Sequence, residues 1–143
     1  MKNLLVLCEG NICRSPMAQG LIGAALPSLR VASAGLGAMV GMPADEIAIR
    51  LLKERGIDIA EHRATQINRN MCLDADMVLV MDSEQRGRVE SLYPQARGRV
   101  FRLGEYTKQD IPDPFRQPEA VFRHSLTLIQ EASQEWLRRI DKL

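Results

Sequence analysis

Residues 2–16 read KNLLVLCEGNICRSP and carry the strongest structural signal in the sequence. The apolar run at the start, Lys2 to Leu7, has the continuous hydrophobicity of a strand that is buried on both faces of a parallel sheet. Ser15 and Pro16, at the end, are typical of the first turn of a helix. The stretch therefore predicts a central strand, a short loop that begins at Cys8, and a helix directly after the loop.

The rest of the chain continues this alternation of strand and helix signals. Further short strands are predicted at residues 30–33, 76–81 and 98–103. Helices are predicted from Ser15 to before Pro27, from Pro43 to Gly56, over Ile67 and Met71, from Asp82 or Ser83 to before Pro94, and from Pro118 onward. The last helix carries one stripe that is apolar apart from Ser133, formed by Phe122, Leu126, Ile129, Ser133, Trp136 and Ile140. This order predicts an α/β fold with a four-stranded parallel sheet flanked by helices on both faces.

Length, composition and charge restrict the class of protein. A chain of 143 residues, 45% hydrophobic and 26% charged, predicts a single globular domain over residues 1–143. The 19 basic and 18 acidic residues leave a net charge of +1, which provides no basic surface for nucleic acid. No apolar run approaches the roughly 18 residues of a membrane helix. Three cysteines in a core of this size are expected to be free thiols, so we expect a soluble, cytoplasmic protein.

The loop between the first strand and the first helix predicts a binding site for a tetrahedral oxyanion. Such a loop can point several backbone N–H groups inward, and the helix N-terminus adds partial positive charge. Cys8 stands at the carboxyl end of the strand, where this field would stabilise a thiolate. Arg14 can hold two phosphoryl oxygens with its planar guanidinium, and Ser15 can donate its hydroxyl to the thiolate.

These residues resemble the Cys-x5-Arg-Ser phosphate loop of the low-molecular-weight protein-tyrosine phosphatases. The resemblance covers nearly the whole chain, because Asp113-Pro114-Phe115 stands where this family carries its late Asp-Pro-aromatic motif. Residues 33–41, SAGLGAMVG, further resemble the bacterial branch that serves capsule and exopolysaccharide export. The resemblance implies a flavodoxin-like three-layer fold and hydrolysis of phosphotyrosine without a metal or organic cofactor. It also implies a cytoplasmic protein partner, a tyrosine autokinase with a phosphorylated tyrosine-rich tail.

The same resemblance implies a role for each residue of the motif. Cys8 would attack phosphorus to form a cysteinyl-phosphate, while Arg14 and the loop amides hold the negative charge. Asp113 would protonate the departing phenolate and then activate the water that releases inorganic phosphate. The predicted substrate-binding residues are Glu9, Gly10, Asn11, Ile12, Cys13, Ser15 and Phe115, and no residue is predicted to bind a metal. Among them, Asn11 would brace a strained turn and Phe115 would form an aromatic wall.

Three positions leave questions open. Glu9 is a carboxylate at a position that is usually apolar or neutral in this family, and we expect it to repel a dianionic substrate. Cys13 has two interpretations: it is either the partner of Cys8 in a protective reversible disulfide or a small buried side chain. His62 is expected to have a structural role rather than a catalytic one.

Three other functions use related cysteine loops. Arsenate reduction relays oxidation through two further cysteines after the third strand, and no cysteine follows Met81. Protein-arginine phosphatases tend to have threonine where this chain has Ile12. A phosphocysteine carrier needs no acid for a leaving group, so Asp113 argues against it. Phosphotyrosine hydrolysis is therefore the predicted activity, and the sequence leaves the natural substrate and the oligomeric state open.

Overall fold

Residues 3–8 form the strand around which the other elements are arranged. The computed structural model describes residues 1–140, so the last three residues of the predicted 1–143 domain lie outside it. Leu4 and Val6 pack into one apolar core, and Leu5 and Leu7 into a second core on the opposite face of the sheet. All four side chains are buried, as the continuous apolar run predicted.

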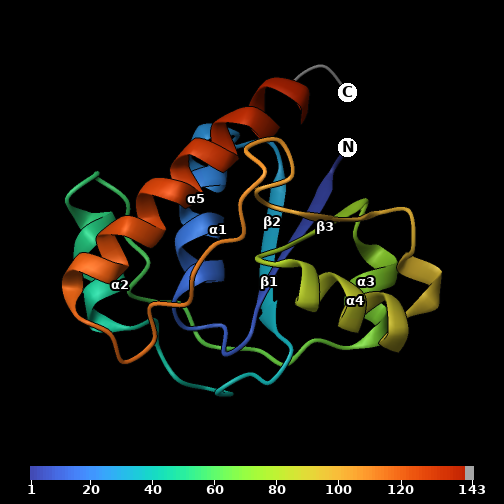
Figure 1. Ribbon diagram of the computed structural model, residues 1–143, viewed down its shortest axis with the longest axis horizontal. Helices are drawn as coiled ribbons and strands as arrows, with labels where there is room; N and C mark the ends of the chain where they lie inside the picture. Colours follow the sequence, from blue (N-terminus) through green and yellow to red (C-terminus); the bar gives the residue numbers. More distant parts are fainter. Residues whose placement is uncertain (141–143) are drawn as a thin grey trace.

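Helices cover both faces of a single parallel sheet. In chain order the elements are β1 (Asn3–Cys8), α1 (Arg14–Ala25), β2 (Arg30–Gly35), α2 (Glu46–Lys53), α3 (Arg69–Asp74), β3 (Met77–Val80), α4 (Ser83–Leu92), the 3-10 helix η1 (Pro94–Ala96), β4 (Val100–Arg102) and α5 (Glu119–Ile140). The strand order is β2-β1-β3-β4, with α1, α2 and α5 on one face and α3 and α4 on the other (Figure 1). This order is that of a flavodoxin-like sheet, and the predicted three-layer α/β fold is confirmed.

Helix α2 begins at Glu46, and the prediction that Pro43 lies in its first turn is wrong. Pro43 instead forms an isolated antiparallel bridge with Arg63. The side chain of Asp45 accepts a hydrogen bond from the backbone N–H of Ile47 at 2.9 Å and so caps the helix. A capping carboxylate satisfies one of the free N–H groups of the first turn, which is why the helix begins after Asp45.

The start of α3 and the ends of β1 and β2 also differ from the sequence prediction. Helix α3 begins after Asn68, whose side chain caps the N–H of Met71 at 2.9 Å, so Ile67 is outside the helix. Strands β1 and β2 both run further than predicted, because Cys8 pairs in register with Gly35. Cys8 is therefore the last residue of a central strand.

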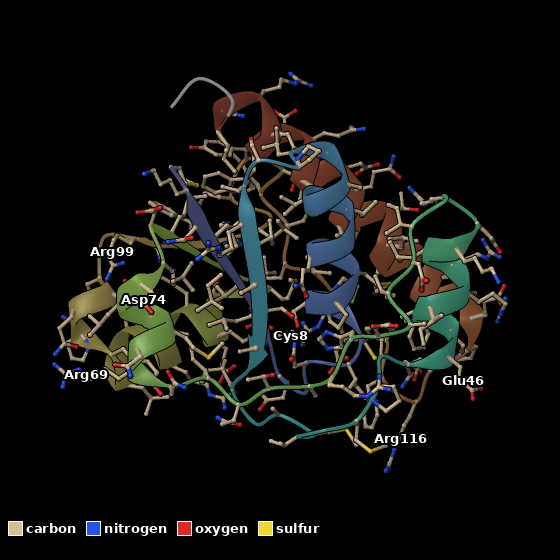
Figure 2. All side chains as sticks on the ribbon, turned by 180° about the vertical axis from the view of Figure 1, so that it is seen from behind. Cys8, Glu46, Arg69, Asp74, Arg99 and Arg116 are labelled. Atoms are coloured by element: carbon tan, nitrogen blue, oxygen red, sulfur yellow. The ribbon has the colours of Figure 1, made fainter. Side chains whose placement is uncertain are left out.

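The stripe on α5 is buried as predicted, and the helix lies across α1 (Figure 1). The indole N–H of Trp136 donates to the carbonyl of Leu103 at 2.7 Å, which ties α5 to the chain just beyond β4. The N-terminus lies at the end of the sheet opposite to Cys8 (Figures 1 and 2). Within residues 1–140, every helix is too short or too polar to span a membrane.

Ser133, the polar residue of this stripe, is buried, and its hydroxyl has no hydrogen-bond partner within residues 1–140. A buried hydroxyl without a partner costs about 1–3 kcal/mol, and alanine also has the higher helix propensity. We therefore expect Ser133→Ala to raise the free energy of unfolding by about 1 kcal/mol in urea titrations. Ser125→Ala is the matched control, because the Ser125 hydroxyl donates to the Pro112 carbonyl at 2.8 Å and its loss should destabilise. Destabilisation by both variants would contradict the conclusion that the buried Ser133 hydroxyl is unpaired.

Candidate active site

The loop after β1 turns its carbonyl groups outward. Backbone N–H groups of residues 36–45 donate to four of these carbonyls at 2.8–3.0 Å, in the pairs Leu36 to Cys8, Gly37 to Glu9, Met39 to Gly10 and Asp45 to Ile12. The Nε2 atom of His62 lies 2.7 Å from the carbonyl oxygen of Asn11. In a trans peptide the N–H points opposite to the C=O, so outward carbonyls leave the loop N–H groups directed inward. A ring of inward N–H groups is suited to binding an anion.

The sulfur of Cys8 is buried within this loop and is contacted from two sides. The Oγ atom of Ser15 is 3.0 Å from Sγ, and the N–H of Asn11 donates to Sγ at 3.3 Å. The Asn11 amide also donates to Ser15 Oγ at 2.7 Å, which leaves the Ser15 hydrogen free to point at the sulfur. The Asn11 N–H and the Ser15 hydroxyl are thus both placed to direct a hydrogen at the sulfur.

Asn11 holds the loop from behind. Its φ of 60° is in the left-handed region, which asparagine tolerates better than most residues. Besides Ser15, its amide nitrogen donates to Ser33 Oγ at 3.0 Å, and its amide oxygen accepts from the N–H of Thr65 at 2.9 Å. Thr65 thus contributes to the loop through its backbone N–H.

Arg14 is a buried cation fixed by three groups. Its side chain is 5% exposed, and Nη1 donates to the carbonyl of Ile111 at 2.9 Å. Nη1 also lies 3.5 Å from Asp82, and Nη2 lies 3.6 Å from Asp113. A guanidinium removed from water is tolerated only when it is paired in this way, and the pairing fixes the position of the Arg14 side chain beside the pocket.

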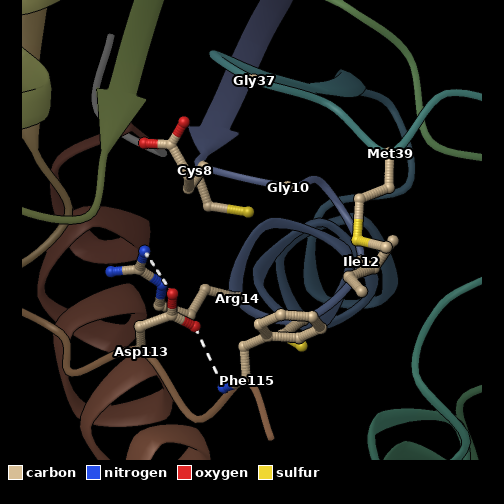
Figure 3. A pocket seen from close by; sticks show the side chains of 10 residues that line it. Cys8, Gly10, Ile12, Arg14, Gly37, Met39, Asp113 and Phe115 are labelled. Atoms are coloured by element: carbon tan, nitrogen blue, oxygen red, sulfur yellow. Dashed lines mark hydrogen bonds and ion pairs between the residues drawn. The ribbon is translucent and has the colours of Figure 1, made fainter.

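Asp113 reaches the site on the loop that follows β4. Two hydrogen bonds hold this loop: the N–H of Ile111 donates to the Met81 carbonyl at 2.9 Å, and Ser125 donates to Pro112. The Asp113 carboxylate accepts the N–H of Phe115 at 3.1 Å and remains about half exposed (Figure 3). Asp113 is therefore held beside Arg14 while one side of its carboxylate stays open to solvent.

These elements enclose a pocket at the carboxyl end of β1 (Figure 3). It is lined by Cys8, Glu9, Gly10, Ile12, Cys13, Arg14, Gly37, Met39, Asp113 and Phe115. Asn11 and Ser15 were predicted to bind substrate but do not line the pocket. Both are fully buried behind the loop, because their side chains hold the loop and the Cys8 sulfur.

The sequence analysis missed four residues in or beside this pocket. Gly37 and Met39 form part of its wall, Asp82 pairs with Arg14, and Arg88 pairs with Glu9. Asp82 lies two residues after the end of β3, and the carboxyl ends of parallel strands meet at one edge of the sheet, so its position gave a signal. Gly37 and Met39 lie in the segment 33–41 that resembles the bacterial branch of the family, but Arg88 had no signal in the sequence.

Glu9 is not the bare carboxylate that the sequence suggested. Arg88, from α4, donates from Nη1 to one Glu9 oxygen and from Nη2 to the other at 3.3 Å. The expected repulsion between Glu9 and a dianionic substrate is therefore reduced by a counter-ion that lies 79 residues further along the chain.

Two other titratable side chains lie around the loop. Burial raises the pKa of the Cys13 thiol, and the Asp45 carboxylate is the next cause, so this thiol stays protonated. Burial lowers the pKa of His62, against the opposing effect of its hydrogen bond to Asn11. A neutral His62 can donate its Nε2 hydrogen to the Asn11 carbonyl. Within residues 1–140, no group of three or more His, Cys, Asp or Glu side chains is placed to hold a metal ion.

A buried cysteine at the end of a strand, a loop suited to an anion, a buried arginine and a nearby carboxylate are the arrangement expected of a cysteine-dependent phosphatase. The family model for low molecular weight phosphotyrosine protein phosphatase matches residues 3–143. The chain is 46% identical to the probable phosphatase EpsP of Ralstonia nicotianae, over 100% of this chain and 99% of that protein. The chain therefore belongs to the low molecular weight protein-tyrosine phosphatases, which are phosphate-ester hydrolases, and the predicted family is confirmed.

Solved structures agree with this assignment. The tyrosine phosphatase Wzb from Escherichia coli K30, in complex with sulphate, is similar with a TM-score of 0.93 and 35% identity, over 97% of this chain and 98% of that one. The arginine phosphatase YwlE from Geobacillus stearothermophilus is similar with a TM-score of 0.92 and 32% identity, over 99% of this chain and 94% of that one. The fold is therefore shared by phosphatases named for two different phosphorylated residues.

The lowered pKa of His62 predicts a pH dependence of stability. Below the usual histidine value of 6.5 the unfolded chain binds a proton that the folded chain binds only at lower pH. The contribution of His62 to stability is thus complete above about pH 6.5 and is lost as the pH falls toward the lowered value. In urea titrations between about pH 7.5 and 5.5, the wild type should lose more stability on acidification than His62→Gln, which keeps a hydrogen donor. Equal losses in the two proteins would contradict the role given to His62.

Proposed function

We propose that Cys8, Arg14 and Asp113 carry out the hydrolysis of phosphotyrosine in this pocket through a cysteinyl-phosphate. The observation that supports this most strongly is their convergence: the three residues come from the end of β1, the start of α1 and a loop about 100 residues later, yet all line one pocket. Chemically they supply a nucleophile, a charge-stabilising cation and a proton donor.

The proposed reaction has two steps. In the first, the Cys8 thiolate attacks phosphorus, an S–P bond forms, and the P–O bond to the phenol breaks as Asp113 gives its proton to the departing oxygen. In the second, the Asp113 carboxylate takes a proton from water, and the water oxygen attacks phosphorus. The S–P bond then breaks, which releases inorganic phosphate and restores the thiolate. Arg14 and the loop N–H groups hold the equatorial oxygens in both steps.

The walls of the pocket favour an aryl phosphate. Ile12, Met39 and Phe115 line it with apolar surface, which suits the ring of phosphotyrosine better than a phosphorylated guanidinium. Parallel assays with phosphotyrosine, phosphoarginine and arsenate test this preference. We expect phosphotyrosine to be hydrolysed fastest. Faster turnover of phosphoarginine would overturn the substrate assignment.

The natural substrate proposed for this pocket is a phosphorylated tyrosine autokinase of a capsule or exopolysaccharide export system, met in the cytoplasm. Support comes from residues 33–41, which resemble that bacterial branch of the family and include two residues of the pocket wall, Gly37 and Met39. Incubation with the phosphorylated tail of such a kinase should release phosphate faster than incubation with an unrelated phosphotyrosyl peptide.

Cys8→Ser should abolish hydrolysis of aryl phosphates but retain binding of inorganic phosphate, because Arg14 and the loop amides remain. Turnover is measured with a chromogenic aryl phosphate, and phosphate binding by calorimetry. Cys72→Ser is the matched control, since Cys72 is buried in the core on the opposite face of the sheet. Turnover by Cys8→Ser within about tenfold of wild type would reject Cys8 as the nucleophile.

Asp113→Asn should lower turnover by roughly 10²–10⁴-fold on a substrate with a poor leaving group such as phenyl phosphate. The loss should shrink for an ester of a strongly acidic phenol, which leaves without a proton. Asp110→Asn serves as control, because Asp110 lies on the same loop but pairs with Arg102. An equal defect on both substrates would show that Asp113 does not protonate the leaving group.

A further inference from the structure

The ion pair between Arg88 and Glu9 lies at the rim of the pocket, and a second carboxylate, that of Glu84, also contacts Arg88. Arg88 holds both oxygens of the Glu9 carboxylate, and its Nε atom lies 3.5 Å from Glu84 one helical turn earlier in α4. Arg88 and Glu9 are both part-exposed, with side-chain exposures of 36% and 45%. The pair therefore links the second residue of the phosphate loop to α4, a helix that contributes no wall residue to the pocket.

Gly37 borders the space that the Glu9 carboxylate occupies. A Cβ atom at Gly37 would lie 2.8 Å from a Glu9 oxygen, which is too close for two non-bonded atoms. The Gly37 N–H also donates to the Glu9 carbonyl at 2.9 Å, so the backbones of the two residues are fixed relative to each other. The missing side chain of Gly37 thus leaves the space in which Arg88 can hold Glu9.

The position of this carboxylate matters because Glu9 lines the same pocket as Cys8 and Arg14. A free carboxylate there would oppose the entry of a phosphoryl dianion, and the opposition would be strongest at low salt. A bidentate guanidinium both cancels the charge and fixes the direction of the side chain. Glu9 can therefore stay in the loop without weakening the site.

We propose that Arg88 is a positioning residue for substrate binding: it holds Glu9 in the space beside Gly37 and neutralises it, so that the pocket accepts a phosphoryl dianion. This inference rests on the proposed phosphatase reaction and adds a specificity-determining residue to it. Arg88 acts through Glu9 and takes no part in bond making or breaking.

The central test is a double-mutant cycle of Arg88→Met and Glu9→Gln, measured on one small aryl phosphate. Arg88→Met should raise KM about two- to fivefold with kcat unchanged, and the rise should disappear at high salt. It should raise the inhibition constant of inorganic phosphate by the same factor. Adding Glu9→Gln to Arg88→Met should return both constants close to the wild-type values. Arg88→Lys keeps the positive charge, so its KM should be much closer to wild type than that of Arg88→Met.

Gly37→Ala tests the importance of the position of the Glu9 carboxylate without removing a charge. The added methyl should displace the Glu9 carboxylate, so KM should rise although Arg88 is present, and Glu9→Gln should relieve the rise. Arg86→Met is the control for loss of one positive charge from α4, because Arg86 pairs with Glu90 and Glu105 instead. Thermal unfolding of every variant shows whether it is folded.

Two outcomes would overturn the inference. One is a KM for Arg88→Met that equals that of wild type or of Arg86→Met. The other is a fall in kcat at constant KM, which would mean that Arg88 acts on the chemical step or on folding. Failure of the proposed function is distinguishable, because in that case the wild-type protein itself would not hydrolyse the aryl phosphate.

Discussion

The structure of the site depends on the direction of the peptide groups in residues 8–12. Each of these carbonyls faces outward to a partner in another segment, four to residues 36–45 and one to His62. Because the opposite side of each peptide carries the N–H, these outward bonds create the inward anion site. The function of the loop therefore depends on chain segments that contribute few groups to the pocket themselves.

Burial of Arg14 imposes the second constraint. A buried guanidinium must be paired, and its partners come from the end of β3 and from the loop after β4. The same contacts that make the buried charge tolerable hold Asp113 beside the pocket. Stabilisation of the cation and positioning of Asp113, the proposed proton donor, are thus one arrangement, although Asp113 lies far from Cys8 in sequence.

Much of the fold and part of the site could be predicted from the sequence. The strands and the order of elements followed from apolar runs and caps, because the residues of each such signal lie close together in the chain. The family followed from the Cys8 to Ser15 motif together with Asp113-Pro114-Phe115. Pro43 was misplaced because a bridge to Arg63 determines its conformation. Asn11 and Ser15 were listed as substrate-binding residues, but their side chains lie behind the loop rather than in the pocket. There Ser15 contacts the Cys8 sulfur and the Asn11 amide braces the turn, as the motif had suggested.

The sequence by itself determined the parallel α/β sheet, the anion-binding loop and the identity of the groups available for chemistry. Only the tertiary structure decided how these groups are charged and directed. Glu9 read in isolation is a carboxylate that opposes a phosphoryl dianion, but folding places it against Arg88 of α4 and in the space left by Gly37. The reason is physical: backbone hydrogen-bonding patterns repeat locally along the chain, whereas ion pairing depends on distance in space, which only the packing of α4 against the sheet sets.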